Sequence, residues 1–260
     1  METILLDFEE DLAWLTLHRP ERRNAINAVM IEELLAALDA CEQKGARAVI
    51  LTGAGSAFCS GMDLEMLRGL AGQSAEEHLA ESRRLAHLFR RLYEFPAPTI
   101  AAVNGAAVAG GCGLATLCDF TLSVSTAKFG YPEVRIGFLP ALVSVFLVRQ
   151  VGEKRARDLL LTGRLLDAEE AAQWGLITRV VGSNEVETNE LCAQARELAA
   201  LLRKNSPQSL SACKRILAAL PRPSLQEALD YAARENAAAR QTAGFHEGIT
   251  SFLEKRAPRW

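Results

Sequence analysis

The sequence lacks an excess of positive charge, and this absence argues against nucleic acid as a partner. Its 260 residues include 29 Lys and Arg against 32 Asp and Glu, which gives a formal net charge of −3. Proteins that bind nucleic acid or an acidic membrane surface through charge present a basic patch, and this balance gives no sign of one. We therefore expect no nucleic acid and no membrane among the partners of this protein.

Long apolar runs are also missing. No run of apolar residues reaches the roughly 18 that a membrane-spanning helix needs. The first residues, METILLDFEED, are acidic and lack the basic segment that opens a secretory signal peptide. The C-terminal Pro-Arg-Trp is not a peroxisomal targeting signal. By elimination, the sequence predicts a cytoplasmic protein.

Cysteine and histidine are sparse, and their spacing argues against metal and disulfide sites. The sequence has six cysteines without a C-x-x-C pair, and four histidines without the paired spacing of zinc ligands. We therefore expect free thiols in a reducing compartment. Because no redox-cofactor motif is visible either, we expect no metal and no separate cofactor.

The sequence does contain the composition of an ordinary soluble enzyme, with 49% apolar and 23% charged residues. Its length suits one large domain, or one domain with a small appendage. Strands alternate with helices up to about residue 181, and the remainder is helical. This pattern is typical of an α/β domain followed by a helical cap or assembly element.

Individual elements follow from hydrophobic periodicity and capping residues. Asn27 caps one helix, and Ser74 with Glu77 forms a capping box at the start of another. Asp167 with Glu170 opens a short helix in the same way. The expected strands are 3–8, 12–18, 46–52, 100–103, 120–124 and 176–181, and the main expected helices are 28–44, 74–93, 112–117 and 155–162.

The stretch from Ile100 to Phe120, IAAVNGAAVAGGCGLATLCDF, consists almost entirely of small and apolar residues. Its pattern predicts a buried strand, a loop and then a helix. Side chains this small let another group approach the backbone closely. The start of such a helix also aims free N–H groups at one point, which suits a phosphate or a developing oxyanion.

Two common phosphate-binding motifs do not match this stretch. A P-loop needs Lys followed by Ser or Thr after its glycines, and a dinucleotide fingerprint needs a third glycine that the run Gly111-Cys112-Gly113 lacks. The residues alone leave two interpretations open. One is close helix packing without chemistry, and the other is an oxyanion site.

Four motifs in register resemble those of the crotonase (enoyl-CoA hydratase/isomerase) superfamily, over nearly the whole chain. The family signature is met from Ile100 to Phe120 without a gap. The other three are Leu17-His18-Arg19-Pro20 with Asn24-Ala25, Ile50-Leu51-Thr52-Gly53 followed by Phe58-Cys59-Ser60-Gly61-Met62-Asp63-Leu64, and Phe129-Gly130-Tyr131-Pro132-Glu133 with Gly137.

The resemblance implies an α/β fold, a crotonase-like spiral of repeated β-β-α units over residues 1–190. A C-terminal helical region at 191–260 would take part in trimerisation, and the trimers usually pair into hexamers. The substrate would be an acyl-CoA thioester, with coenzyme A as part of the substrate. Its enolate would be held by two backbone N–H groups, which by position belong to Met62 and Gly110. Such preset donors act on charge that develops in the transition state.

The resemblance also assigns Glu133 as the acid/base. In the family's hydratases two glutamates flank a water, and the position of the first falls here on Gly113, which has no side chain. We expect the space over Gly113 to hold a second water, an anion or a substrate carboxylate. Tyr131, Asp63 or Glu65 would be the substitutes for the missing acid.

Substrate contacts follow from the same resemblance. CoA would lie along Ala57–Met62, and Arg22, Arg23 and a neighbouring subunit's Lys255 or Arg256 would meet its phosphates. Bulky residues after Glu133 replace a glycine-rich run of the family, which favours a short or branched acyl group. The substrate-binding candidates are Phe58, Ser60 and Leu64 at the adenine, together with Asp63, Gly113, Tyr131 and Leu142.

Two enzyme activities stay open at this point. We favour an acyl-CoA hydratase/dehydratase, which interconverts 2-enoyl-CoA with water and 3-hydroxyacyl-CoA, because that activity is broad in the family. The alternative is a Δ3-Δ2-enoyl-CoA isomerase that uses Glu133 alone, since Gly113 replaces the second glutamate. A non-catalytic member that binds acyl-CoA comes third, and the missing fingerprint argues against a dinucleotide-dependent enzyme.

Overall fold

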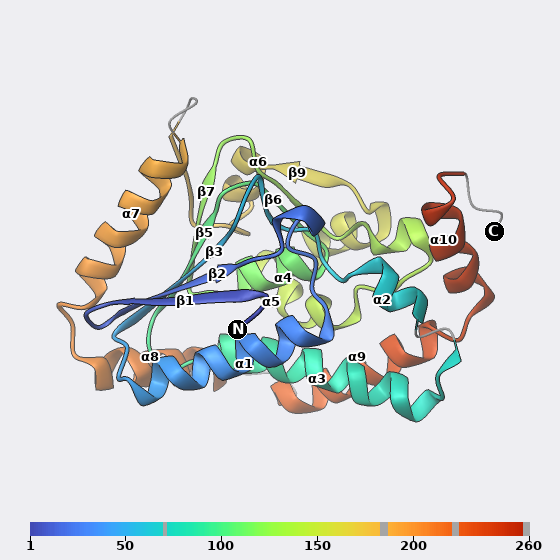
Figure 1. The fold of residues 1–260 in the computed structure, drawn as a ribbon, viewed down its shortest axis with the longest axis horizontal. Coiled ribbons are helices and arrows are strands. Elements are labelled where there is room, and N and C mark those ends of the chain that lie inside the picture. Colours follow the sequence, from blue (N-terminus) through green and yellow to red (C-terminus); the bar gives the residue numbers. More distant parts are fainter. Residues whose placement is uncertain (70–71, 183–186, 220–223, 257–260) are drawn as a thin grey trace.

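The computed structural model describes residues 1–69, 72–182, 187–219 and 224–256, and arranges them as two β-sheets surrounded by helices (Figure 1). The strands are β1 (Ile4–Glu9), β2 (Leu12–Leu17), β3 (Ala48–Gly53), β4 (Ala57–Cys59), β5 (Thr99–Val103), β6 (Ala106–Val108), β7 (Phe120–Val124), β8 (Lys128–Gly130), β9 (Leu165–Asp167) and β10 (Arg179–Val181).

The helices follow the periodic segments of the sequence. They are η1 (Pro20–Arg22), α1 (Ala28–Gln43), α2 (Leu64–Gly69), α3 (Ala75–Tyr93), α4 (Gly110–Leu117), η3 (Pro132–Ile136), α5 (Ala141–Thr162), α6 (Ala168–Gln173), α7 (Glu187–Leu202), α8 (Pro207–Ala219), α9 (Leu225–Ala239) and α10 (Ala243–Leu253). None of the helices in the described ranges combines the length and apolar character that crossing a bilayer requires.

The chain alternates between the two sheets. The larger sheet has the order β1-β2-β3-β5-β7-β10, and the smaller has the order β4-β6-β8-β9. Each pair β3–β4, β5–β6 and β7–β8 therefore contributes one strand to each sheet, and a helix follows before the next pair. This is the repeated β-β-α unit of the predicted spiral, so the predicted fold class is confirmed.

Capping residues set the helix boundaries as predicted. The Asn27 side chain accepts a hydrogen bond from the Met30 N–H at 2.9 Å, and Ser74 with Glu77 forms the capping box of α3. One prediction was wrong in extent, because the helix expected at 155–162 is only the end of α5. Gly152 interrupts α5 with φ +77, a conformation that separates its apolar first half from its polar second half.

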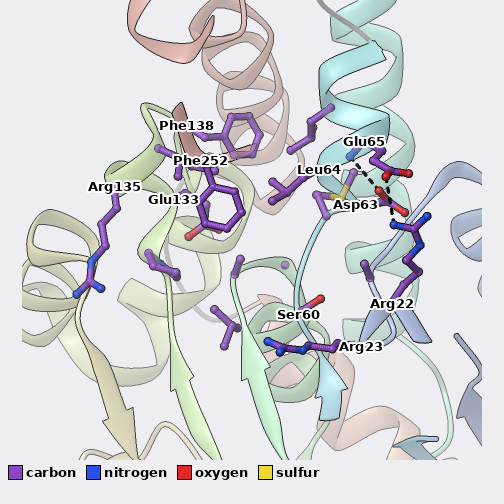
Figure 2. A pocket seen from close by; sticks show the side chains of 18 of the residues that line it. Arg22, Arg23, Ser60, Asp63, Leu64, Glu65, Glu133, Arg135, Phe138 and Phe252 are labelled. Carbon is purple, nitrogen blue, oxygen red and sulfur yellow. Dashed lines mark hydrogen bonds and ion pairs between the residues drawn. The ribbon is translucent and has the colours of Figure 1, made fainter. Parts of the chain in front are cut away.

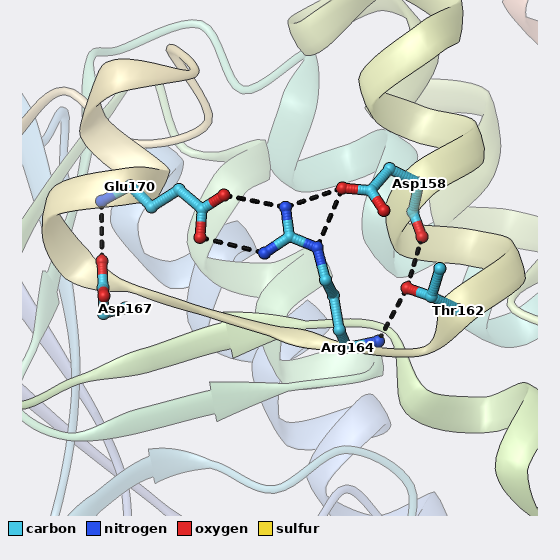
Figure 3. A network of polar contacts seen from close by, with 5 residues as sticks. All are labelled: Asp158, Thr162, Arg164, Asp167 and Glu170. Carbon is cyan, nitrogen blue, oxygen red and sulfur yellow. Dashed lines mark hydrogen bonds and ion pairs between the residues drawn. The ribbon is translucent and has the colours of Figure 1, made fainter.

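Arg164 lies between α5 and β9 and joins them to α6. Its guanidinium binds Asp158 of α5 at 2.6 Å and Glu170 of α6 at 2.8 Å (Figure 3). It also lies 4.9 Å from the Trp174 ring centroid. Both carboxylates raise the pKa of Arg164 above its usual range. The network ties β9, the edge strand of the smaller sheet, to the helices on either side of it.

Helix α4 packs against the smaller sheet at the centre of the main core. Every residue from Gly110 to Leu117 is buried. A Cβ atom at Gly111 would lie 2.2 Å from the Cys59 carbonyl oxygen, so only glycine fits against β4 here. The small residues of this stretch thus allow the close packing that one of the two sequence interpretations required.

The helices after residue 187 divide between the core and the outer surface. Helix α7 packs against β3, β5 and β7, α9 packs against α3 and α5, and α10 packs against η3 and α2. Figure 1 shows α1, α3 and α9 along one side of the larger sheet. The domain division expected at residue 190 falls inside α7, and the role of 191–260 in trimerisation stays a prediction.

Candidate active site

A cavity of about 690 Å³ opens at the edge of the smaller sheet (Figure 2). Arg22 and Arg23 line it on one side and Glu133 and Phe252 on the other, as the close view shows. Its walls come from the loop after β2, the loop after β4, the β6–α4 junction, η3 and the end of α10. Of the residues expected to bind substrate, Ser60, Asp63 and Leu64 also line it.

The three residues assigned to catalysis follow three neighbouring parallel strands. Strand β4 is parallel to β6, and β6 is parallel to β8. Met62 comes three residues after β4, Gly110 two residues after β6, and Glu133 three residues after β8. Because neighbouring strands lie about 4.8 Å apart, the carboxyl ends of this sheet bring the three residues to one edge, where α/β proteins commonly bind ligands. All three line the cavity.

The backbone N–H groups of Met62 and Gly110 are available to a ligand. Gly110 is the first residue of α4, where an N–H group has no partner within the helix. Among the described residues, neither amide donates a hydrogen bond. The two segments are in contact, because a Cβ atom at Gly61 would lie 3.4 Å from the Gly110 nitrogen.

Ala109 has an unusual backbone conformation immediately before this helix. Its φ is +54 and its ψ is −130, a region that costs a residue with a Cβ atom about 1–3 kcal/mol. Two hydrogen bonds hold it there, since its N–H donates to the Gly130 carbonyl at 2.8 Å and its carbonyl accepts from the Gly113 N–H at 3.1 Å. The two hydrogen bonds hold Ala109 in this strained conformation and so fix the direction of the Gly110 amide.

Glu133 is a buried carboxyl group at the inner end of the cavity. It is 7% exposed, and its Oε2 has no hydrogen-bond partner among the described residues. Burial raises the pKa of Glu133 from 4.5 to about 8. A carboxyl group with such a pKa exchanges protons near neutral pH, which is what a general acid/base requires.

A second, smaller cavity continues inward from the same three residues. Its volume is about 30 Å³, and Met62, Gly110 and Glu133 line it together with residues of α3, α5 and α9. Leu142 and Val143 of α5 form part of this apolar wall. Leu142, one of the expected substrate-binding residues, thus lines this cavity together with Met62, Gly110 and Glu133, and its role in binding stays a prediction.

The space over Gly113 is closed, and the expectation of a water, an anion or a substrate carboxylate there was wrong. A Cβ atom at Gly113 would lie 2.7 Å from Val143 Cγ1 and 3.3 Å from Phe89 Cζ. Apolar side chains from two helices therefore occupy the volume that a glutamate would need. Gly113 itself is buried and lines neither cavity.

We expect Gly113→Glu to destabilise the protein by at least about 3 kcal/mol, because it overpacks the core and buries an unpaired carboxyl group. Thermal unfolding measures this as a lowered Tm. The double variant Gly113→Glu with Val143→Ala should recover part of the loss, since it removes the nearest methyl group. A single variant as stable as the parent would contradict the closed space.

Two further predictions about site residues need correction. Phe58 has no exposed surface and belongs to the main hydrophobic core, so its ring cannot contact an adenine. Tyr131 is 1% exposed and lines neither cavity, and its hydroxyl lies 3.4 Å from Thr116 Oγ1. Burial raises the pKa of Tyr131 well above its usual value, so it does not replace the missing acid.

The other two substitutes for that acid are held by arginines. Asp63 binds Arg19 at 3.0 Å, and Glu65 binds Arg22 at 3.2 Å. Asp63 also accepts a hydrogen bond from the Glu65 N–H and so fixes the start of α2. Both carboxylates shape the cavity wall, and Glu133 is the buried carboxyl group at its inner end. Within the described ranges, no group of three His, Cys, Asp or Glu side chains could hold a metal ion.

Asn24 ties the loop after β2 to strand β4 and to the turn before it, a role that the sequence motif did not reveal. It is fully buried with φ +55, and its side-chain amide donates to the carbonyls of Ala54, Ala57 and Phe58 at 2.8–3.1 Å. Its Oδ1 accepts a hydrogen bond from the Arg19 N–H at 2.9 Å. An Asn four residues after Pro20 is the sequence signal for such a turn, because Asn tolerates positive φ.

We expect Asn24→Ala to lower the stability by about 3 kcal/mol, because it leaves buried carbonyl groups without donors at a position with positive φ. The loop after β4 should become less ordered and the KM for substrate should rise. Thermal unfolding and steady-state kinetics measure the two effects. A variant with an unchanged Tm would show that these hydrogen bonds do not hold the loop.

Known proteins resemble this chain in both sequence and structure. Residues 7–260 match the family model described as enoyl-CoA hydratase/isomerase. A Thermus thermophilus protein provisionally named enoyl-CoA hydratase is 48% identical, over 96% of this chain and 97% of its own length. The Escherichia coli 2,3-dehydroadipyl-CoA hydratase is 33% identical, over 99% and 98%. The crystal structure of an enoyl-CoA hydratase/isomerase from Xanthobacter autotrophicus Py2 superposes with a TM-score of 0.88, at 32% identity, over 97% of this chain and 93% of that one.

Proposed function

This chain belongs to the enoyl-CoA hydratase/isomerase family, and from that membership we propose that it catalyses the reversible addition of water to a 2-enoyl-CoA thioester. The observation that carries the proposal is the position of Met62, Gly110 and Glu133 at the ends of three neighbouring parallel strands. That arrangement puts two free amides and one buried carboxyl group around one cavity.

The two amides would bind the thioester carbonyl oxygen. This oxygen gains negative charge only as the enolate forms, so donors that are already in place stabilise the transition state more than the substrate. The positive end of the α4 dipole supports the Gly110 amide in this role. CoA would occupy the larger cavity, with Arg22 and Arg23 near its phosphates and Ser60 and Leu64 near its adenine.

Glu133 would handle both proton transfers of hydration. As a carboxylate it takes a proton from the attacking water while the water oxygen bonds to C3 and the double-bond electrons move into the enolate. As the resulting acid it gives that proton to C2, which restores the carboxylate. The reverse sequence expels water. No second carboxyl group is needed, which fits the closed space over Gly113.

Isomerisation of a 3-enoyl to a 2-enoyl thioester is the second candidate, and the filled space over Gly113 favours it. Glu133 would take a proton from C2 and return it to C4, so one carboxyl group again completes the reaction. The absence of any volume for a second acid–base group beside Gly113 suits a reaction that does not involve water.

A direct comparison of substrates tests both candidates. Hydration of crotonyl-CoA is measured as a loss of its conjugated absorbance. Isomerisation of 3-hexenoyl-CoA is measured as the appearance of a conjugated absorbance. The third substrate, 3-methylglutaconyl-CoA, extends the set to a branched acyl group. Turnover of the first supports the hydratase, and turnover of the second alone supports the isomerase. Binding of all three without turnover would show a non-catalytic member. The homotrimer or hexamer and the cytoplasmic location stay predictions.

A further inference from the structure

The smaller cavity ends at two polar side chains in an otherwise apolar wall. Asn236 lies on α9 and Arg240 directly follows that helix, and both line the cavity together with Glu133 and Gly110. The rest of the wall is Met62, Leu85, Phe89, Phe138, Leu139, Pro140, Ala141, Leu142 and Val143. An acyl group that extends past the amides and the carboxyl group would therefore meet a guanidinium.

The Arg240 guanidinium is buried, and among the described residues one of its five N–H donors makes a hydrogen bond. Its side chain is 2% exposed, and its Nη1 donates to Glu81 Oε2 at 2.9 Å. Its Nε is buried and has no hydrogen-bond partner among the described residues, where Nη2 also makes no hydrogen bond. In a guanidinium, Nε and Nη2 form one edge that matches the two oxygens of a carboxylate.

The attraction of Glu81 does not fully offset the burial of the Arg240 charge. Desolvation by burial lowers the pKa of Arg240 despite the attraction of Glu81. His78, a titratable group near Arg240, has its pKa lowered by burial and by the charge of Arg240, which favours its neutral form. Phe138 contributes only its ring, 5.8 Å from the guanidinium. A buried donor without an acceptor is unfavourable, and a ligand that supplies an acceptor removes this cost.

Asn236 is fixed by contacts of its own. Its Oδ1 accepts a hydrogen bond from Ser82 Oγ at 3.0 Å, and its Nδ2 donates to the Leu139 carbonyl at 3.2 Å. These contacts join α9 to α3 and to the segment before α5. Both polar atoms of the Asn236 side chain thus have partners, whereas Arg240 Nε lacks a hydrogen-bond acceptor among the described residues.

We propose that the preferred acyl group carries a carboxylate at its far end and that the Nε–Nη2 edge of Arg240 binds it. The substrates would then be short dicarboxylic acyl thioesters. This inference rests on the proposed function for the orientation of the acyl group. The cavity volume of about 30 Å³ and the closed space over Gly113 restrict the chain to a few carbons.

Water is the other occupant that the cavity could hold, because its volume of about 30 Å³ exceeds the minimum that a buried water needs. A water would satisfy Arg240 Nε without giving any preference for a carboxylate. The two occupants differ in what binds, so a comparison of matched ligands separates them.

Binding of saturated thioesters tests the inference without any turnover. Glutaryl-CoA and adipyl-CoA have a far carboxylate, and pentanoyl-CoA and hexanoyl-CoA are their matched twins without one. We expect calorimetry to show binding of the better dicarboxylic ligand about 10- to 100-fold tighter than its twin, the range for hydrogen bonds to charged groups. Arg240→Met should reduce this ratio to about 1, and Arg240→Lys should retain part of it.

Arg234→Met is the matched control, because Arg234 is exposed on the same helix and should leave the ratio unchanged. Thermal unfolding of each variant verifies that it folds. Equal affinity for both members of each pair in the parent protein would overturn the inference in favour of water. The inference would also be overturned if Arg240→Met weakened the binding of both members of a pair equally. A carboxylate preference without turnover of any enoyl thioester would support this inference while the proposed function failed.

Discussion

Glu133→Gln is expected to lower kcat by about 10²–10⁴-fold, the usual contribution of a general acid/base. The amide has nearly the same shape, so the cavity and the two backbone amides should keep their geometry. It cannot accept a proton from water or from carbon, so both candidate reactions should lose the same step. Substantial activity in this variant would remove Glu133 from the mechanism.

The same variant should be more stable than the parent at neutral and alkaline pH, although it is less active. Glu133 has its pKa raised from 4.5 to about 8 in the folded state, so its contribution to stability is present below pH 4.5 and is lost as the pH rises to about 8. Glutamine does not ionise. The free energy of unfolding of the variant, relative to that of the parent, should therefore increase across this pH range by an amount on the order of a few kcal/mol. Thermal unfolding at pH 5 and at pH 8.5 measures the gap.

The pH profile of the parent enzyme follows from the same value. Both proposed reactions begin with the carboxylate form, so kcat/KM should rise with pH and level off above about 8. Glu153→Gln is a suitable control, because Glu153 is an exposed residue of α5 that pairs with Arg157. It should change neither the profile nor the activity. A profile that falls through pH 8 would show that the protonated form acts first.

Gly110→Pro is expected to lower kcat by about 10²–10³-fold, the typical loss when one oxyanion donor is removed. Proline is the one substitution that deletes a backbone N–H, and the first helical position is where a helix best accepts it. The amide of Gly110 has no acceptor among the described residues, so its loss breaks no described hydrogen bond.

Gly110→Ala is the matched control for this variant. Alanine retains the N–H group, and its Cβ would lie 3.4 Å from Ile26 Cδ1, an ordinary contact with a flexible side chain. Its activity should therefore stay much closer to that of the parent. The Tm of both variants shows whether the strained Ala109 tolerates the change. Equal activity losses in the two variants would mean that bulk, and not the lost donor, matters at this position.

Much of the fold could be predicted from the sequence because its long elements have strong periodicity and caps. Helices α1 and α3 begin where Asn27 and Ser74 predict, and β3 and β5 are apolar runs buried on both faces. The strands of the smaller sheet could not be predicted in the same way. They are three residues long, too short to show alternation. Two of them, β4 and β6, consist mostly of small residues and lie in the loops expected around Ala57 and Gly105.

The candidate site was predictable where chemistry depends on the backbone or on a motif. Gly110, at the start of α4, and the Pro132-Glu133 pair were singled out from motifs, and all three residues line the cavity. Side chains that arrive from distant segments could not be predicted. Val143 and Phe89 meet over Gly113 from α5 and α3, and Arg240 reaches the inner cavity from the end of α9. Only tertiary packing brings these residues together, and no local pattern records it.

The three parallel strands β4, β6 and β8 have a consequence for folding. Each supplies one of the reactive groups, and the pairing that aligns them joins parts of the chain about 20 to 50 residues apart. Contacts of such long range form late, because loop closure must come first. The appearance of catalysis during refolding should therefore lag behind helix formation, and a fragment that ends before β8 should be inactive. Turnover thus serves as a reporter of the completed spiral.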